Sequence, residues 1–252
     1  MKNKLNLTLI FFLLFSSISL TAQVSSGEVS YKQKFIENLF DSIAIKKIDT
    51  KFRSQLDFVN KSLRTHSDNF EFILKFNRAE SIYKLVKKMN NDKDRGYKIA
   101  AKYSRIDDVY YKNIQSGEKL VQKESFGELF IIKYDLNNIK WKLINKTKTI
   151  KNYKCFMATT TKIVKNSKGV FEKPVIAWYS PDIPLNYGPK GYGGLPGLIL
   201  ELHEDKLMYY VTKIKLNPIG TIEIIKPEKG KTLTENEFEL KIKEMSSGFW
   251  RD

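Results

Sequence analysis

The densest group of side chains that could hold a metal ion lies in the pentapeptide ELHED. Glu201 and His203 are two positions apart, so they would share one face of a strand. Imidazole and carboxylate are common ligands of transition metals, and further ligands could come from Cys155, Glu204 or Asp205. Two ligands on one strand make only half a site, and spacing identifies no third. The pattern leaves a metal site at Glu201 and His203 open, beside the simpler interpretation of a polar strand end that turns into a hairpin.

Nucleophilic catalysis has little support in the sequence. His66 and His203 are the two histidines, and neither lies at a recognisable spacing from a serine or cysteine nucleophile. Cys155, the single cysteine, lies within YKCFM, which reads as the middle of a strand where a small buried side chain is expected. We therefore expect no catalytic residue, no cofactor and no enzymatic activity.

Four aromatic residues flank a glycine-rich segment: Trp178, Tyr179, Tyr187 and Tyr192. Large aromatic side chains beside a flexible rim could line a groove for an apolar chain or a peptide. The alternative is that they fill the core of a sheet. They are the candidate ligand-binding residues, with Tyr187 and Tyr192 foremost.

The segment GYGGLPGLIL places four glycines and a proline directly before an apolar strand. A phosphate-binding loop needs its glycines between a strand and a following helix, and a Lys followed by Ser or Thr closes it. Here the glycines precede a strand and no such lysine follows. We therefore expect the segment to shape the backbone. The glycines would leave room for another chain segment to approach closely, the proline would remove one backbone amide donor, and a glycine would permit a bulge or kink. The structural motif consists of Gly193, Gly194, Leu195, Pro196, Gly197, Leu198 and Ile199.

The candidate residues must be positioned by the rest of the chain, and short strands are predicted over most of it. Residues 27–35 alternate, with Val29, Tyr31 and Gln33 on one face, and residues 69–77 and 81–89 also favour strands. NNDKDRG reads as a loop. After it come DVYYKNI, KLVQKESF, ELFIIKYDL, IKWKLIN, NYKCFMATTTKIV, VFEKPVIAWYS, LPGLILELH, KLMYYVTKIKL and TIEIIKP, all strand-like. Such a series without intervening helices indicates an antiparallel meander.

Two amphipathic helices are predicted outside this series. The first begins near Asp49 or Thr50, and its apolar stripe consists of Phe52, Leu56, Val59 and Leu63. The second follows a capping box at Thr234 and Glu237, and its stripe consists of Phe238, Ile242 and Met245. We therefore expect an α+β fold, mostly antiparallel β. Its form would be a single strongly curved sheet or an open barrel, like the periplasmic lipoprotein carriers, with a few covering helices.

The first residues are typical of an export signal. Residues 2–23 have a short basic start, an apolar stretch of about ten residues and small residues before a cleavage point, too short to span a bilayer. We expect a signal peptide at 1–22, a single domain at 23–252, no transmembrane segment after cleavage, and a periplasmic or extracellular location. Because Cys155 is the only cysteine, neither a lipid anchor nor an internal disulfide is expected.

The net charge of +16, or +14 without residues 1–22, raises the question of nucleic acid. The lysines are scattered rather than gathered in a basic helix, so we expect no nucleic-acid partner. A basic surface that meets anionic lipid headgroups or acidic partners fits the pattern better.

The segment AWYSPDIPLNYGPKGYGGLPGLILEL resembles the signature of the GLPGLI family, exported proteins of Bacteroidota named for this motif. GEVSYKQKF, FILKFNRAESIY and WKLINKTKTIKNYKCFMATT resemble other blocks of the same family. The helical stretch after the first block and the final helix do not match. The resemblance implies an envelope protein without an established biochemical role.

These observations favour a non-enzymatic binding protein or carrier for a hydrophobic ligand, a lipoprotein or a peptide segment. Two alternatives stay open: a metal-binding or metal-dependent envelope protein, and a structural partner of an outer-membrane complex.

Overall fold

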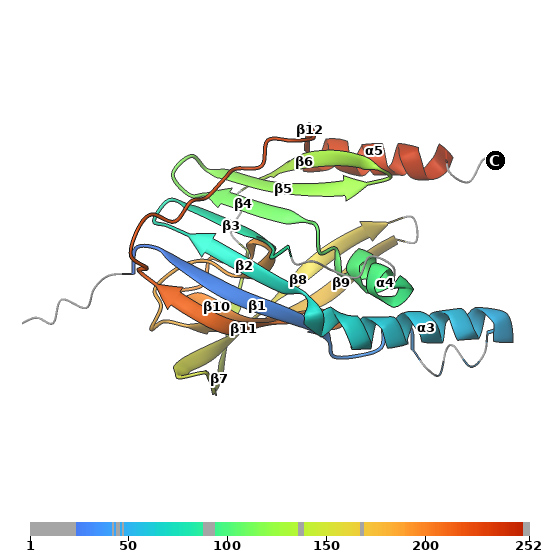
Figure 1. Ribbon diagram of the computed structural model, residues 1–252, viewed down its shortest axis with the longest axis horizontal. Helices are drawn as coiled ribbons and strands as arrows, with labels where there is room; N and C mark the ends of the chain where they lie inside the picture. Colours follow the sequence, from blue (N-terminus) through green and yellow to red (C-terminus); the bar gives the residue numbers. More distant parts are fainter. Residues whose placement is uncertain are drawn as a thin grey trace, which may run out of the picture.

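The computed structural model describes residues 24–41, 43, 46, 48–87, 94–135, 139–166 and 169–248, so the expected signal peptide lies outside the described part. Twelve strands form one sheet (Figure 1). They are β1 (Gly27–Phe35), β2 (Glu71–Phe76), β3 (Glu80–Leu85), β4 (Val109–Asn113), β5 (Glu118–Ser125), β6 (Glu128–Tyr134), β7 (Lys142–Ile150), β8 (Tyr153–Asn166), β9 (Gly169–Ser180), β10 (Leu198–Glu204), β11 (Leu207–Leu216) and β12 (Lys231–Thr234). The helices are α3 (Thr50–His66), α4 (Arg95–Ser104) and α5 (Glu235–Gly248), with short 3₁₀ helices η1 (Ser67–Asn69) and η2 (Pro189–Gly191).

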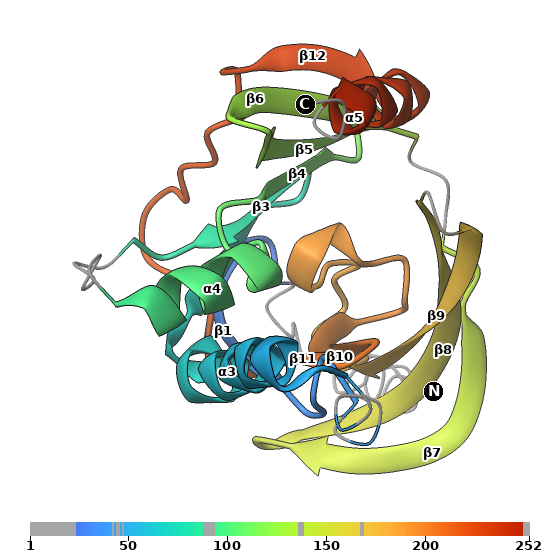
Figure 2. The same ribbon diagram turned by 90° about the vertical axis from the view of Figure 1, so that its right-hand side faces the viewer.

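The strand order is β12-β6-β5-β4-β3-β2-β1-β11-β10-β9-β8-β7. All neighbours are antiparallel except β12 and β6, which run parallel. This confirms the expected α+β class with a mostly antiparallel sheet. β12 and β7 are the two unpaired edges, so the sheet is not closed, and it is not strongly curled either; the expected strongly curved or open-barrel form was therefore wrong. It bends, so that β5 and β6 lie across from β8 and β9 in Figure 2, and residues of all four strands line one cavity.

The core lies on the inner face of the central strands. Val29, Tyr31 and Gln33 of β1 are all fully buried, as their alternation predicts. They lie beside buried side chains of β2, whose positions also alternate between intermediate and buried. A second cluster joins β8, β9, β10 and β11 through residues such as Ala158 and Leu202. The glycine-rich segment leads into β10, which, like β8 and β11, contributes to both of these large apolar clusters.

Helix α3 begins where the sequence predicts, because the Asp49 side chain accepts a hydrogen bond from the Lys51 amide at 2.8 Å. Its apolar stripe covers the core only at its end. Leu63 is 1% exposed, whereas Phe52 is 58% exposed, since the first turns of α3 extend past the sheet (Figure 1).

Helix α4 was not predicted, and it replaces the end of the expected loop at residues 90–96. Residues 90–93 lie outside the described part, but Arg95 and Gly96 are helical. The Asp94 side chain caps the helix by accepting from the Tyr97 amide at 3.1 Å. The buried positions of α4 are Gly96, Ala100 and Ser104. These small residues allow a close approach to α3 but lack the large apolar stripe by which a helix is usually found in a sequence.

The expected strand TIEIIKP was also wrong, because residues 221–229 have no regular secondary structure. The segment instead crosses the outer face of β4 to β6, where Ile224 packs against Tyr111, Leu120 and Ile131. The Gln122 side chain donates to the Lys229 carbonyl at 2.7 Å. Its β-branched pattern therefore reflects side-chain burial on a sheet face rather than strand pairing.

The capping box of α5 is confirmed. The Thr234 amide donates to the Glu237 carboxylate at 2.7 Å, and the Glu237 amide donates to the Thr234 hydroxyl at 3.3 Å. Phe238 from the predicted stripe is partly buried and packs edge to face on Phe130, with ring centroids 5.3 Å apart. Helix α5 thus covers one end of β6, and its first residue, Glu235, lines a cavity.

Candidate functional site

The glycine-rich segment is crowded rather than open to a ligand. A Cβ at Gly193 would lie 2.2 Å from the Asn186 carbonyl oxygen, and one at Gly197 would lie 2.2 Å from the Ser180 carbonyl oxygen. The Gly193 carbonyl accepts a hydrogen bond from the Trp141 indole at 2.9 Å. The segment precedes the strand β10 and does not begin a helix, so its geometry is that of a tightly packed corner.

The four predicted aromatic residues do not form one groove. Tyr179 is buried against Phe156, and Tyr187 is buried and stacks on Phe76 with centroids 5.7 Å apart. Trp178 is partly buried, and the Lys148 ammonium lies over its ring, 4.4 Å from the centroid. Tyr192 lines the larger of the two described cavities and Tyr187 the smaller one, whereas Trp178 and Tyr179 line neither.

The metal candidates are already paired with each other and with a lysine. His203 Nε2 lies 2.5 Å from Glu201 Oε1, and Lys148 Nζ lies 2.7 Å from the same oxygen. Burial opposes ionisation of Glu201, but these two partners lower its pKa below the usual range. No group of three or more histidine, cysteine or acidic side chains in the described residues is placed to hold a metal ion. The arrangement is that of an ion-paired strand end.

Cys155 is a buried thiol in the core. Burial raises its pKa to about 11, so it is protonated at neutral pH. The sulfur lies 3.5 Å from the Tyr153 carbonyl oxygen. Its environment is that of a small core side chain.

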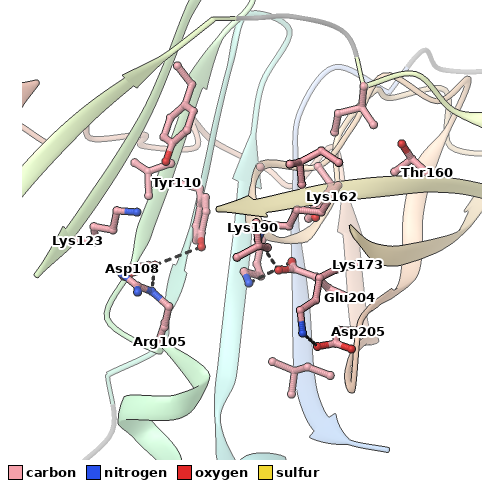
Figure 3. Close-up of a pocket in the computed structure, with 18 of the residues that line it drawn as sticks. Arg105, Asp108, Tyr110, Lys123, Thr160, Lys162, Lys173, Lys190, Glu204 and Asp205 are labelled. Carbon is pink, nitrogen blue, oxygen red and sulfur yellow. Dashed lines mark hydrogen bonds and ion pairs between the residues drawn. The ribbon is translucent and has the colours of Figure 1, made fainter. Parts of the chain in front are cut away.

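The larger of the two described cavities has a volume of about 850 Å³, is open to the surface and lies between β5–β6 and β8–β9 (Figure 3). One wall is formed by β5, β6 and the start of α5, and the other by β8 and β9. The end of α4, the segment η2 and the ends of β1, β10 and β11 form the floor. Both polar and apolar side chains line the cavity. The apolar and aromatic ones include Phe35, Val121, Val164, Tyr192 and Leu207.

An ion-paired cluster lies at the floor of this cavity. Glu204 accepts from Lys162 at 2.5 Å and from Lys190 at 3.2 Å. Glu204 and Lys190 are each 13% exposed. Burial alone would raise the pKa of Glu204, but the two ammonium groups lower it to about 2. Lys190 also lies 5.4 Å from the ring centroid of Tyr209, so its charge is held by a carboxylate and an aromatic face.

This cavity and its cations were not predicted from the sequence. KLVQK in β5 places Lys119, Val121 and Lys123 on one face of the strand, and all three line the cavity. In a sheet with one buried face, the residues on that face are usually apolar. Here two lysines share the face of a buried valine, and this departure from the pattern is the signal that could have identified them.

No helix in the described part of the chain is long and apolar enough to cross a membrane. Fold and cavity together define a β-rich protein with a cation-lined hollow on the inner side of an open sheet.

Comparison with known proteins gives two findings, one for a short segment and one for the fold. A family model described as "Protein of unknown function (Porph_ging)" matches residues 166–201, which include the GLPGLI motif. No curated protein sequence matches the chain. The fold is similar to PNGF-II in a C2 crystal form, with a TM-score of 0.50, 15% identity and coverage of 88% of this chain and 32% of that one. A P21 form of PNGF-II gives a TM-score of 0.50, 14% identity and coverage of 86% and 33%. The chain thus spans about a third of PNGF-II.

Proposed function

We propose that this chain is a non-enzymatic binding protein or carrier of the cell envelope, and that its ligand is a hydrophobic or amphiphilic molecule held in the cavity between β5 and β8. The cavity is the observation that carries the proposal. Its volume of about 850 Å³ falls within the range of small-molecule sites. The cavity is open to the surface, so a ligand could enter without unfolding the core.

The lining favours a ligand with an apolar part. Val121 and Val164 contribute aliphatic surface from opposite walls, and Tyr110 and Tyr192 contribute aromatic surface from the floor. Aliphatic and aromatic side chains with a few polar groups are typical of sites for small organic ligands. Cys155 and His203, the groups that the sequence offers first for catalysis, are not part of this lining: Cys155 is buried in the core, and His203 is hydrogen-bonded to Glu201.

Binding can be tested with a fluorescent fatty acid added to detergent-free protein, followed by displacement with oleate. Thr160→Trp would place a large ring in the cavity from β8, where Figure 3 shows Thr160. Thr159→Trp, the neighbouring position that is not part of the lining, is the matched control.

We expect saturable binding by the unaltered protein and by Thr159→Trp. Thr160→Trp should weaken it by about tenfold or more, which corresponds to about 1.4 kcal/mol. No saturable binding by the unaltered protein, or equal binding by the two tryptophan variants, would count against the cavity as the site.

A further inference from the structure

The positive charges of the cavity are unevenly compensated. At the floor and on the β8–β9 wall, three lysines have acidic partners: Lys162 and Lys190 share Glu204, and Lys173 pairs with Asp205 (Figure 3). Most of the positive charge on this side of the cavity is therefore balanced within the protein itself.

The remaining floor cations are also satisfied. Arg105 pairs with Asp108 at 2.9 Å. Lys206 donates to the carbonyl oxygens of Asn38 and Leu39 at 2.8 and 3.0 Å. An incoming anion would have to break an existing interaction to bind either of these groups directly.

Lys119 and Lys123 on the opposite wall are different. Neither forms an ion pair or a hydrogen bond from its ammonium group within the described residues. Their close contacts are with aromatic rings: Lys123 Nζ lies 4.5 Å from the ring centroid of Phe238, and Lys119 Nζ lies 5.7 Å from that of Tyr134. Because alternate residues share a face, both point to the same side of β5 as Val121.

Partial burial disfavours the charged form of Lys119 and Lys123 when no counterion is bound. It lowers the pKa of both lysines, that of Lys123 to about 8. Asp108 and Glu235 act on Lys123 in the opposite sense, and Arg105 and Lys162 lower its pKa further. Asp108 and Glu235 also line the cavity, but neither lies within ion-pair distance of these two lysines, so a partly buried ammonium here gains from an anion that enters the cavity.

We propose that Lys119 and Lys123, about 13 Å apart along β5, are two anchor points on one wall, and that either of them binds the acidic group of an amphiphilic ligand whose apolar part lies along the cavity toward β8. The inference rests on the proposed function and specifies the chemistry of its ligand. The acidic group is a carboxylate or a phosphate, since both accept hydrogen bonds from ammonium groups. Val121 lies between the two lysines on the same strand face, so apolar lining begins directly beside the charges.

The test compares three ligands with the same eighteen-carbon apolar chain, on the full exported domain: oleate, oleyl phosphate and uncharged oleyl alcohol. Lys119→Met and Lys123→Met, singly and together, remove the charges but keep a long apolar side chain. Lys133→Met on β6 is the matched control, because Lys133 is exposed, lies opposite Leu120 in the register and does not line the cavity. Lys123→Arg keeps a positive charge at one position.

We expect the double variant to lose about tenfold to a hundredfold in affinity for oleate or oleyl phosphate, whichever binds more tightly, as befits hydrogen bonds to charged groups. Its affinity for oleyl alcohol should change by less than about threefold, which also shows that the variant is folded. Lys133→Met should bind all three as the unaltered protein does, and Lys123→Arg should retain most of the anion affinity.

Two results would overturn the inference while leaving the proposed function intact: oleate binding that is unchanged in the double variant, or an equal loss for oleate and oleyl alcohol. If the unaltered protein binds none of the three ligands, the proposed function fails and the inference fails with it.

Discussion

Replacing Gly193 with alanine is expected to destabilise the protein by about 3 kcal/mol. The new Cβ would lie 2.2 Å from the Asn186 carbonyl oxygen, so the two segments must separate by about 1 Å to reach ordinary contact distance. That movement would strain the hydrogen bond from Gly194 N to Asn186 O, now 3.3 Å, and that from the Trp141 indole to the Gly193 carbonyl, now 2.9 Å. Each bond contributes about 1 kcal/mol, and overpacking adds about 1–3 kcal/mol.

Gly194→Ala is the comparison that isolates crowding from backbone conformation. Gly194 has φ +83° and no other atom within 4 Å of the point that a Cβ would occupy, so alanine there meets only the left-handed backbone cost of about 1 kcal/mol. Urea unfolding followed by far-ultraviolet circular dichroism gives both free energies of unfolding. A Gly193→Ala variant that is no more destabilised than Gly194→Ala would refute the crowding argument.

Four further outcomes are expected. Glu204→Gln should lower the free energy of unfolding by about 3 kcal/mol in a urea titration, because Lys190 stays nearly buried without its carboxylate; a loss below about 1 kcal/mol would contradict this. In the unaltered protein, the Glu204 contribution should be complete above about pH 4.5 and disappear as the pH falls toward about 2 in an acid unfolding series. Oleate affinity should fall between about pH 7 and 9 at constant ionic strength, because Lys123 loses its proton with a pKa of about 8; a flat profile in this range argues against the lysine anchor points. Metal analysis of untagged protein should give well under one equivalent, unchanged by His203→Ala, whereas a full equivalent lost in that variant would revive the metal site.

Local patterns were sufficient to predict most strands and their buried faces. In β1, Val29, Tyr31 and Gln33 alternate with polar residues, and the period of two alone decides which side faces the core. The start of α3 at Asp49 and the capping box at Thr234 and Glu237 were likewise readable, because a cap is a contact between residues close in the chain.

The sequence was less informative wherever tertiary contacts override local preference. Helix α4 buries Gly96 and Ala100 where it packs against α3, and small residues give no apolar stripe. Ile224 belongs to a strand-like segment that covers a sheet face without joining the sheet. The arrangement of the sheet as an open one depends on which edges remain unpaired, and no short segment encodes that.

The candidate site could be predicted only in part. Tyr192 was named and lines the cavity, whereas Tyr179 and Tyr187 are core residues. Lys119 and Lys123 were not named, because their distinguishing feature is the lack of an acidic partner in space. The pairing of Lys190 with Glu204 joins a short 3₁₀ helix to the end of a strand, and spacing alone could not assign it.

The most direct test of the proposed site is the location of a bound amphiphile. A crystal structure with a fatty acid brominated near its methyl end would locate the carboxylate in the electron density and the bromine by its anomalous signal. We predict the carboxylate within hydrogen-bonding distance of Lys119 or Lys123 and the bromine inside the cavity toward β8. A bromine on the outer face of the sheet, or a carboxylate bound at the opposite wall with both lysines unoccupied, would contradict this.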